Sequence, residues 1–167
     1  MTTELKIDNR IIGPGRPTFV IAEIGVNHDG SVQKALELVR IAANCGADAV
    51  KLQVFRASRL LHASSTFADY QKQRGGLGKD DTPADMLRKY ELSTDDVRRV
   101  VAAIRELKMV PLATPFSPQD MEVIEALRLP AVKVASPDLV NRPLLDRVAG
   151  YGRPILASAG AATLQET

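Results

Sequence analysis

The fold of this chain is decided by residues 110–158, which read VPLATPFSPQDMEVIEALRLPAVKVASPDLVNRPLLDRVAGYGRPILAS. Three short apolar runs in this stretch, at residues 110–114, 131–135 and 154–158, start 21 and 23 residues apart. Each run is too short for a helix and is aliphatic on both faces, which is typical of parallel strands covered by helices. The segments between the runs carry helix-start signals. Compact repeats of this kind predict a parallel sheet with right-handed crossovers.

The same alternation extends towards the N-terminus. Two further apolar runs lie at residues 19–24 and 49–54, and helical patterns begin at Ser31, Ser93, Ser117 and Asn141. The order β-α-β-α-β-α-β-α-β predicts an α/β fold of the (β/α)8 TIM-barrel type, with about the first five βα units in this chain. A doubly wound open sheet is the alternative. No G-x-G-x-x-G follows the first strand, which argues against the dinucleotide-binding version of that fold.

The C-terminal residues indicate that the barrel continues beyond this chain. Thr163 and Glu166 have the spacing of a capping box, but the sequence ends at Thr167, about one turn into the helix that they would open. Complete barrels typically contain about 250 residues. We therefore expect residues 1–167 to form one partial barrel domain whose C-terminal half is absent. A half barrel that pairs with another chain is the non-catalytic alternative.

Residues 55–92 form the one long insertion in this pattern. A long connection in a compact barrel is more often a lid or a binding loop than filler. We interpret residues 55–92 as a lid-like insertion, with a disordered surface loop as the alternative. Within it, Thr82 and Pro83 predict the start of a short helix.

Composition and charge argue against several classes of partner. The 22 basic and 20 acidic residues give a net charge of +2, and aromatic residues make up only 4% of the chain. These values favour neither nucleic acid nor an acidic membrane surface as a partner. No apolar run approaches the roughly 18 residues of a membrane span, and the first residues contain no signal-peptide pattern. The single cysteine, Cys45, is interpreted as a buried core residue, and we expect a soluble, cytoplasmic protein.

Polar residues occur near the C-terminal end of every predicted strand, and in the second and fourth strands they lie on the face opposite the aliphatic residues. Active sites of barrels lie at this end, and lysine or glutamate is rarely buried there without a partner. Two lysines with several hydroxyl groups suit a pocket for phosphate and carboxylate. A structural ion-pair network is the alternative. The residues are Glu23, Lys51, Gln53, Thr114, Lys133 and Ser158, and Ser136 follows the fourth strand at the same end.

His28 lies in the loop after the first strand, where a histidine could act as an acid, a base or a ligand. We favour a loop-ordering hydrogen bond as its role. The other histidine, His62, falls in the insertion and is interpreted as a solvent-facing residue. The sequence therefore predicts no histidine-based metal site in this chain.

Together these residues resemble the N-acetylneuraminate (sialic acid) synthase family. The resemblance runs from about residue 17 to the end, in the order and spacing of the family. Six motifs taken together are specific, although no single motif would be. They are Ile21-Ala22-Glu23-Ile24-Gly25-Val26-Asn27-His28-Asp29-Gly30, Lys51-Leu52-Gln53, Tyr90-Glu91-Leu92-Ser93, Thr114-Pro115-Phe116-Ser117, Lys133-Val134-Ala135-Ser136 and Asn141-Arg142-Pro143-Leu144-Leu145.

The resemblance implies a reaction of phosphoenolpyruvate with N-acetylmannosamine or a related acylated hexose, which gives a nine-carbon 2-keto acid and phosphate. It implies a divalent metal, Mn²⁺ or Mg²⁺, that activates the aldehyde. The family's metal-binding histidines and its C-terminal antifreeze-like domain, which completes the sugar site across a homodimer, lie in segments that this chain lacks. We therefore expect residues 1–167 alone to bind phosphoenolpyruvate weakly, if at all, and not to turn over.

The resemblance also implies roles for single residues. Lys51, Thr114, Lys133, Ser136 and Ser158 correspond to contacts with phosphoenolpyruvate. Gln53 and Asp138 correspond to contacts with the sugar, and Glu23 to the acidic catalytic group close to the metal.

Some positions depart from the family pattern. Asp138 stands where the family has the longer Glu, and Ala159 where it has Thr. The family's loop asparagine has no clear counterpart near Gly78. These departures suggest a different sugar. The alternative enzyme is a barrel aldolase that uses Lys133 or Lys51 as a Schiff-base nucleophile.

Overall fold

A computed structural model describes residues 4–60, 82–160 and 162–165 of the chain. Its centre is a five-stranded parallel sheet in which the strands lie side by side in chain order, β3-β4-β5-β6-β7. A doubly wound sheet reverses its strand order at a switch point, and the described sheet contains no reversal. The barrel prediction is therefore confirmed for this part of the chain. The strands are β3 (Ile21–Gly25), β4 (Ala49–Val54), β5 (Val110–Pro115), β6 (Val132–Val134) and β7 (Ile155–Ala157).

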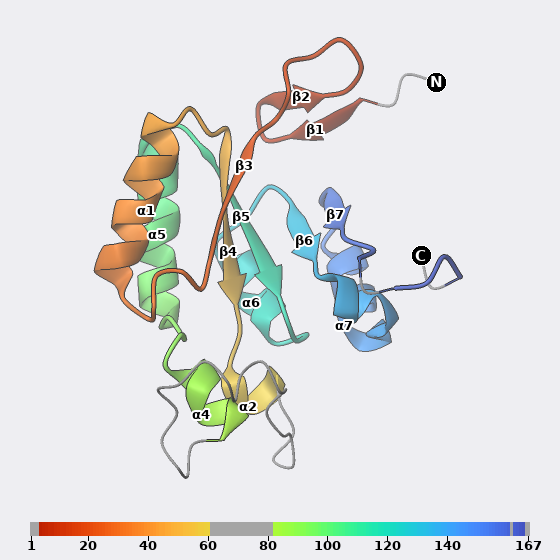
Figure 1. Cartoon of the computed structure of the whole chain (residues 1–167). Helices are drawn as coiled ribbons and strands as arrows, with labels where there is room; N and C mark the ends of the chain where they lie inside the picture. Colours follow the sequence, from red (N-terminus) through yellow and green to blue (C-terminus); the bar gives the residue numbers. More distant parts are fainter. Residues whose placement is uncertain (1–3, 61–81, 161, 166–167) are drawn as a thin grey trace.

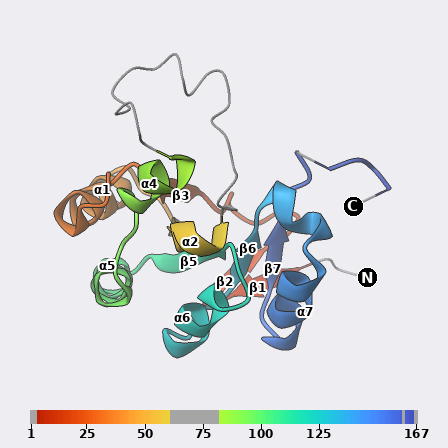
Figure 2. The same ribbon diagram turned by 90° about the horizontal axis from the view of Figure 1, so that it is seen from below.

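Four helices follow the strands and form an arc outside the sheet (Figure 2). On β4, the outward side chains Val50, Leu52 and Val54 are buried against these helices. The inward residue Ala49 belongs to a separate buried cluster. The predicted division of strand faces is confirmed. The helices are α1 (Val32–Asn44), α5 (Thr94–Glu106), α6 (Asp120–Ala126) and α7 (Arg142–Gly150).

Three of the four predicted helix starts are confirmed by their caps. The side chains of Ser31, Ser93 and Asn141 accept hydrogen bonds from backbone amides in the first turns of α1, α5 and α7. The predicted start of α6 at Ser117 is wrong by a few residues. A separate turn comes first, in which the Ser117 hydroxyl accepts from the amide of Asp120 at 3.2 Å.

The prediction that Cys45 is a core residue is wrong. The buried face of α1 consists of Val32, Ala35, Val39 and Ala42, and the helix ends at Asn44. Cys45 occupies the C-cap, where the chain turns away, and it is exposed. The apolar pattern of the helix therefore extends past its last buried turn.

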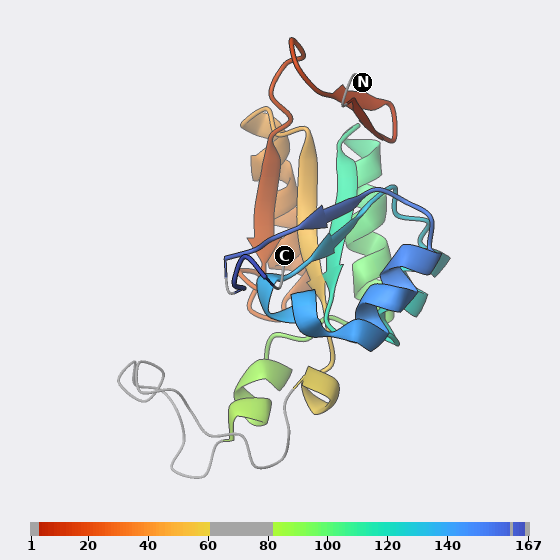
Figure 3. The same ribbon diagram turned by 90° about the vertical axis from the view of Figure 1, so that its right-hand side faces the viewer.

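A β-hairpin that the sequence analysis did not predict precedes the barrel. Its strands, β1 (Leu5–Ile7) and β2 (Arg10–Ile12), pair antiparallel and lie at the end of the sheet where the parallel strands begin (Figures 1 and 3). Ile7 is fully buried against the inward residues of the sheet, which include Ala49, Leu112 and Ala131. The hairpin therefore closes the floor of the half barrel. Two strands of three residues each are too short to give a periodic signal.

Two short helices lie at the opposite end of the sheet, α2 (Ala57–Leu60) and α4 (Pro83–Arg88) (Figure 1). The predicted start of α4 is confirmed, since Thr82 and Asp85 form a reciprocal capping box. The predictions for His62, for the segment around Gly78 and for Glu166 lie outside the described residues.

One carboxylate joins the two described ends of the insertion. Glu91 accepts a 2.6 Å hydrogen bond from the amide of Ala57 and lies 3.7 Å from the guanidinium of Arg56. Arg56 also donates to the carbonyl of Leu92 at 2.8 Å. These polar contacts therefore join the segment that leaves β4 to the segment that leads into α5. We call this group of contacts the Glu91 clasp (residues Arg56, Ala57, Glu91 and Leu92).

Gly30 has no room for a side chain. Its φ is +73°, and a Cβ atom would lie 2.2 Å from the carbonyl oxygen of Lys89. We expect Gly30→Ala to lower the free energy of unfolding by about 2 to 4 kcal/mol, because left-handed backbone and overpacking each cost about 1–2 kcal/mol or more. Urea denaturation measures this loss. Gly46→Ala is the matched control, since Gly46 has φ +77° with no atom within 4 Å of its Cβ position. Equal losses in the two variants would contradict the steric argument.

Among the residues that the structure describes, no helix combines the length and the apolar character needed to span a bilayer.

Candidate functional site

Lys51 is the centre of a polar cluster at the C-terminal end of the sheet. Its ammonium forms an ion pair with Glu23 and donates to the Thr114 hydroxyl at 3.4 Å. The strand register brings these residues close together. Glu23 is the partner of Lys51 across β3 and β4, and Gln53 is the partner of Thr114 across β4 and β5. The Lys51 side chain is only 12% exposed, whereas Glu23 is 48% exposed. Glu23 therefore forms the open side of the pair.

Lys133 adds a second ammonium from β6. Its Nζ atom donates to the carbonyl of Val134 at 2.6 Å. Burial lowers its pKa, the positive charge of Lys51 acts in the same direction, and Glu23 acts in the opposite one. Both lysines and the carboxylate therefore share one electrostatic environment. Among the described residues no carboxylate forms an ion pair with Lys133, so it carries the less compensated charge.

The lowered pKa of Lys133 determines how the stability of the fold and the affinity for an anion change with pH. Between its folded pKa and the ordinary lysine value of 10.5, the unfolded chain binds more protons than the folded one, so folding becomes more favourable as pH rises through this window. An anion bound beside Lys133 would favour the protonated form. Anion affinity should therefore fall as pH rises through the lowered pKa.

Gly25 allows the side chains of Glu23 and Gln53 to approach each other. The register between β3 and β4 shifts after Glu23, at Gly25. A Cβ atom on Gly25 would lie 3.3 Å from Oε1 of Glu23 and 3.6 Å from Nε2 of Gln53. Glu23 and Gln53 therefore approach the same point beside the backbone. The sequence analysis did not assign a role to Gly25, since the register shift is visible only in the structure.

Ser136, Asp138 and Ser158 lie after β6 and β7, at the same end of the sheet. Ser136 opens the 3-10 helix η1 (Ser136–Val140), in which Oδ1 of Asp138 accepts from Nδ2 of Asn141 at 3.0 Å. The amide of Ser158 donates to the carbonyl of Val134 at 3.2 Å. Within the described part of the chain, no hydrogen bond or ion pair joins these three side chains to the lysines. The structure thus connects Glu23, Lys51 and Thr114 directly, whereas it places Ser136, Asp138 and Ser158 only at the same end of the sheet.

His28 orders the loop after β3, as the favoured interpretation held. It is 1% exposed, and its Nδ1 atom accepts a 3.1 Å hydrogen bond from the amide of Gly30. Burial lowers its pKa, which outweighs the opposite effects of a backbone hydrogen bond to Gly25 and of the Asp29 charge. His28 is therefore a neutral imidazole whose accepting nitrogen is occupied by the loop.

A buried carboxylate that the sequence analysis did not single out supports the end of β5. Asp120 accepts from the amide of Phe116 at 3.4 Å and pairs with Arg59 of α2 at 3.2 Å. It is only 4% exposed. The pair holds the turn after Thr114 against the beginning of the insertion. Arg59 and Asp120 are far apart in the sequence, so no local sequence pattern predicts their pairing.

The described carboxylates do not form a divalent-metal site by themselves. Within residues 4–60, 82–160 and 162–165, no three His, Cys, Asp or Glu side chains gather closely enough to hold an ion. Glu23 is engaged by Lys51, and Asp138 by Asn141.

Comparison with known proteins supplies a family and several relatives. The model of the NeuB family matches residues 38–167. The chain is 35% identical to N,N'-diacetyllegionaminic acid synthase of Legionella pneumophila over 92% of its own length and 43% of that protein. It is 32% identical to human N-acetylneuraminate-9-phosphate synthase over 96% of its own length and 44% of that protein.

A solved structure also matches this chain over nearly its whole length. The N-acetylneuraminic acid synthetase of Leptospira borgpetersenii, crystallised with citrate, superposes with a TM-score of 0.82 at 25% identity. The match covers 99% of this chain and 53% of that one. The chain therefore spans about half the length of the proteins that it resembles.

Proposed function

This chain belongs to the NeuB family, and from that premise we propose that it forms the phosphoenolpyruvate-binding half of a synthase that makes a C–C bond. The proposed second substrate is N-acetylmannosamine or a related acylated hexose, and the proposed products are a sialic acid or another nonulosonate and phosphate. The observation that carries the proposal is that Lys51 and Lys133 lie at the same end of the sheet, close enough for their charges to interact, and that Glu23 is the one described carboxylate that forms an ion pair with either of them.

The charge of this cluster suits phosphoenolpyruvate. Two ammonium groups and one carboxylate leave a net positive charge beside the Thr114 hydroxyl. Lysine binds phosphate as a point charge, and hydroxyl groups donate to the remaining oxygens. We assign Lys51, Lys133 and Thr114 to the phosphate and carboxylate, with Ser136 and Ser158 as further donors. Gln53 and Asp138 are assigned to the hexose.

In the proposed reaction, C3 of phosphoenolpyruvate attacks the aldehyde carbon of the open-chain hexose, and a C–C bond forms. Water adds at C2, the bond from C2 to the phosphate-bearing oxygen breaks, and phosphate leaves a 2-keto acid behind. The water loses two protons in all: one is taken up by the aldehyde oxygen, and the other leaves with the phosphate. We assign one of these proton transfers to Glu23, because it is an exposed carboxylate whose charge acts on both lysines. A divalent metal, Mn²⁺ or Mg²⁺, would add Lewis-acid activation of the aldehyde.

The barrel aldolase remains the second candidate, and one observation favours it. A lysine with a lowered pKa and no ion pair to a described carboxylate, as Lys133 has, is suited to form a Schiff base. The pairing of Lys51 with Glu23 and the family match favour the synthase. A homodimer, a cytoplasmic location and a lid formed by residues 55–92 complete the proposal.

We expect residues 1–167 assayed alone with manganese, phosphoenolpyruvate and N-acetylmannosamine to form no sialic acid, because the described residues provide no metal site. Phosphoenolpyruvate should nevertheless bind weakly and perturb the amide NMR signals of Lys51 and Lys133. Turnover by the 167-residue chain would contradict the first expectation. Unchanged signals at both lysines at saturating ligand would contradict the proposed binding role.

A further inference from the structure

A concave surface lies at the end of the sheet opposite the Lys51 cluster, where the parallel strands begin. It encloses about 420 Å³ and collects residues from three separate connections. The β1–β2 hairpin, the link between α6 and β6, and the link between α7 and β7 each contribute. We call it the floor hollow; its lining residues are Lys6, Asp8, Arg128, Pro130, Arg153 and Pro154.

The floor hollow has an uncompensated positive charge. Lys6, Arg128 and Arg153 face one carboxylate, Asp8. In the described ranges of the chain, no carboxylate forms an ion pair with any of the three cations.

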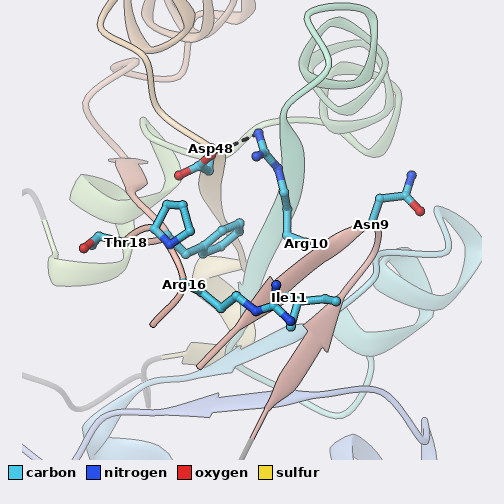
Figure 4. Close-up of a pocket in the computed structure, with 8 residues that line it drawn as sticks. Asn9, Arg10, Ile11, Arg16, Thr18 and Asp48 are labelled. Atoms are coloured by element: carbon cyan, nitrogen blue, oxygen red, sulfur yellow. Dashed lines mark ion pairs between the residues drawn. The ribbon is translucent and has the colours of Figure 1, made fainter. Parts of the chain in front are cut away.

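A neighbouring hollow at the same end provides a contrast (Figure 4). It also contains two arginines, but Arg10 pairs with Asp48 at 3.0 Å and Arg16 pairs with Glu4 at 3.0 Å. Both arginines of that hollow are therefore paired, Arg10 with the lining residue Asp48 and Arg16 with Glu4 outside the lining, whereas no described carboxylate pairs with the cations of the floor hollow. The difference points to an anion from solution as the partner of the floor hollow.

Among the residues that the structure describes, the hydrogen bonds around the two arginines of the floor hollow involve no carboxylate. The Tyr151 hydroxyl donates to the carbonyl of Leu129 at 2.9 Å; burial raises its pKa, and the nearby positive charge of Arg153 opposes this rise. Arg105 donates to the carbonyl of Arg128 at 3.3 Å, which fixes the turn that carries it. The charges of Arg128 and Arg153 are therefore not compensated by these contacts.

We propose that the floor hollow is a binding site for a small anion with two or more charged groups, of the phosphate-ester class. Two guanidinium groups offer paired N–H donors that match phosphate oxygens, and Lys6 adds a point charge. The volume accommodates a molecule of metabolite size. The site is separate from the Lys51 cluster, because the two lie at opposite ends of the strands. It is therefore placed to bind an effector and not a reacting substrate.

Arg128 and Lys108 occupy equivalent backbone positions, so their glycine variants form a matched pair. Arg128 follows the C-cap of α6 with φ +50°, and Lys108 follows the C-cap of α5 with φ +58°. Glycine is the preferred residue at this left-handed position, so replacing either residue removes a cation without straining the helix end. Arg128→Gly removes a cation of the floor hollow, whereas Lys108→Gly removes one from the same position of the neighbouring unit.

Inorganic pyrophosphate is the probe, titrated into the full chain in 0.15 M NaCl and followed by amide NMR. We expect saturable shifts at Leu129 and Arg153. The double variant Arg128→Gly/Arg153→Gln should weaken these shifts at least tenfold in apparent Kd. Lys108→Gly, and Lys133→Met in the other cluster, should leave them unchanged.

The proposal would be overturned by either of two results. One is the absence of saturable shifts at Leu129 in the wild-type chain. The other is an unchanged Kd in the double variant. Shifts that disappear only with Lys133→Met would assign the pyrophosphate to the Lys51 cluster, and would equally overturn the floor hollow as a site.

Discussion

Lys133→Met is expected to weaken phosphoenolpyruvate binding by about 10- to 100-fold without destabilising the chain. A hydrogen bond to a charged group contributes about 1.5–3 kcal/mol, and each 1.4 kcal/mol is a factor of about ten in affinity. Stability should be unchanged or higher, because burial already opposes the charge of Lys133 in the folded state. No described carboxylate loses an ion pair when that charge is removed.

The measurements for Lys133→Met are an NMR titration with phosphoenolpyruvate and urea denaturation. Lys108→Met is the control for a general loss of positive charge, since Lys108 lies at the end of α5. A variant that binds as well as the wild type would remove Lys133 from the proposed site. A variant that loses binding only because it unfolds would show a lowered urea midpoint.

Lys51→Met is expected to have the larger effect, because it removes a proposed phosphate contact and also leaves Glu23 unpaired beside the anion. Binding should weaken by about 100-fold or more, since the lost charge-assisted contact is joined by repulsion between Glu23 and the ligand. Stability should fall by about 1 kcal/mol, because Glu23 is half exposed and water compensates for much of the lost pair.

The double variant Glu23→Gln/Lys51→Met separates the two effects of this substitution. It should regain the lost stability, since no carboxylate is left without its partner. It should regain only the repulsive share of the binding loss, because the ammonium is still absent. Full recovery of binding in the double variant would mean that Lys51 acts only by neutralising Glu23.

The strands and their faces were predictable because they depend on local patterns. β4 was predicted at its observed bounds, and the inward direction of Lys51 and Gln53 followed from the alternation of side chains. Three helix starts were predictable because an N-cap depends only on neighbouring residues. These N-caps are Ser31, Ser93 and Asn141.

The features that the sequence did not predict depend on distant contacts. The floor hairpin is stable because Ile7 is buried against strands that follow it by more than forty residues. The choice of Glu23, and not another acid, as the partner of Lys51 depends on the register between β3 and β4, which shifts at Gly25. The pairing of Arg59 with Asp120 likewise joins segments far apart in the chain.

The Glu91 clasp bears on how this protein could change over evolutionary time. Because the two ends of the excursion are already held together, a longer or shorter segment between them costs the sheet little. Each doubling of a closed loop costs only about 0.6 kcal/mol. A change in the length or the composition of that segment would therefore leave the lysine-bearing strands as they are.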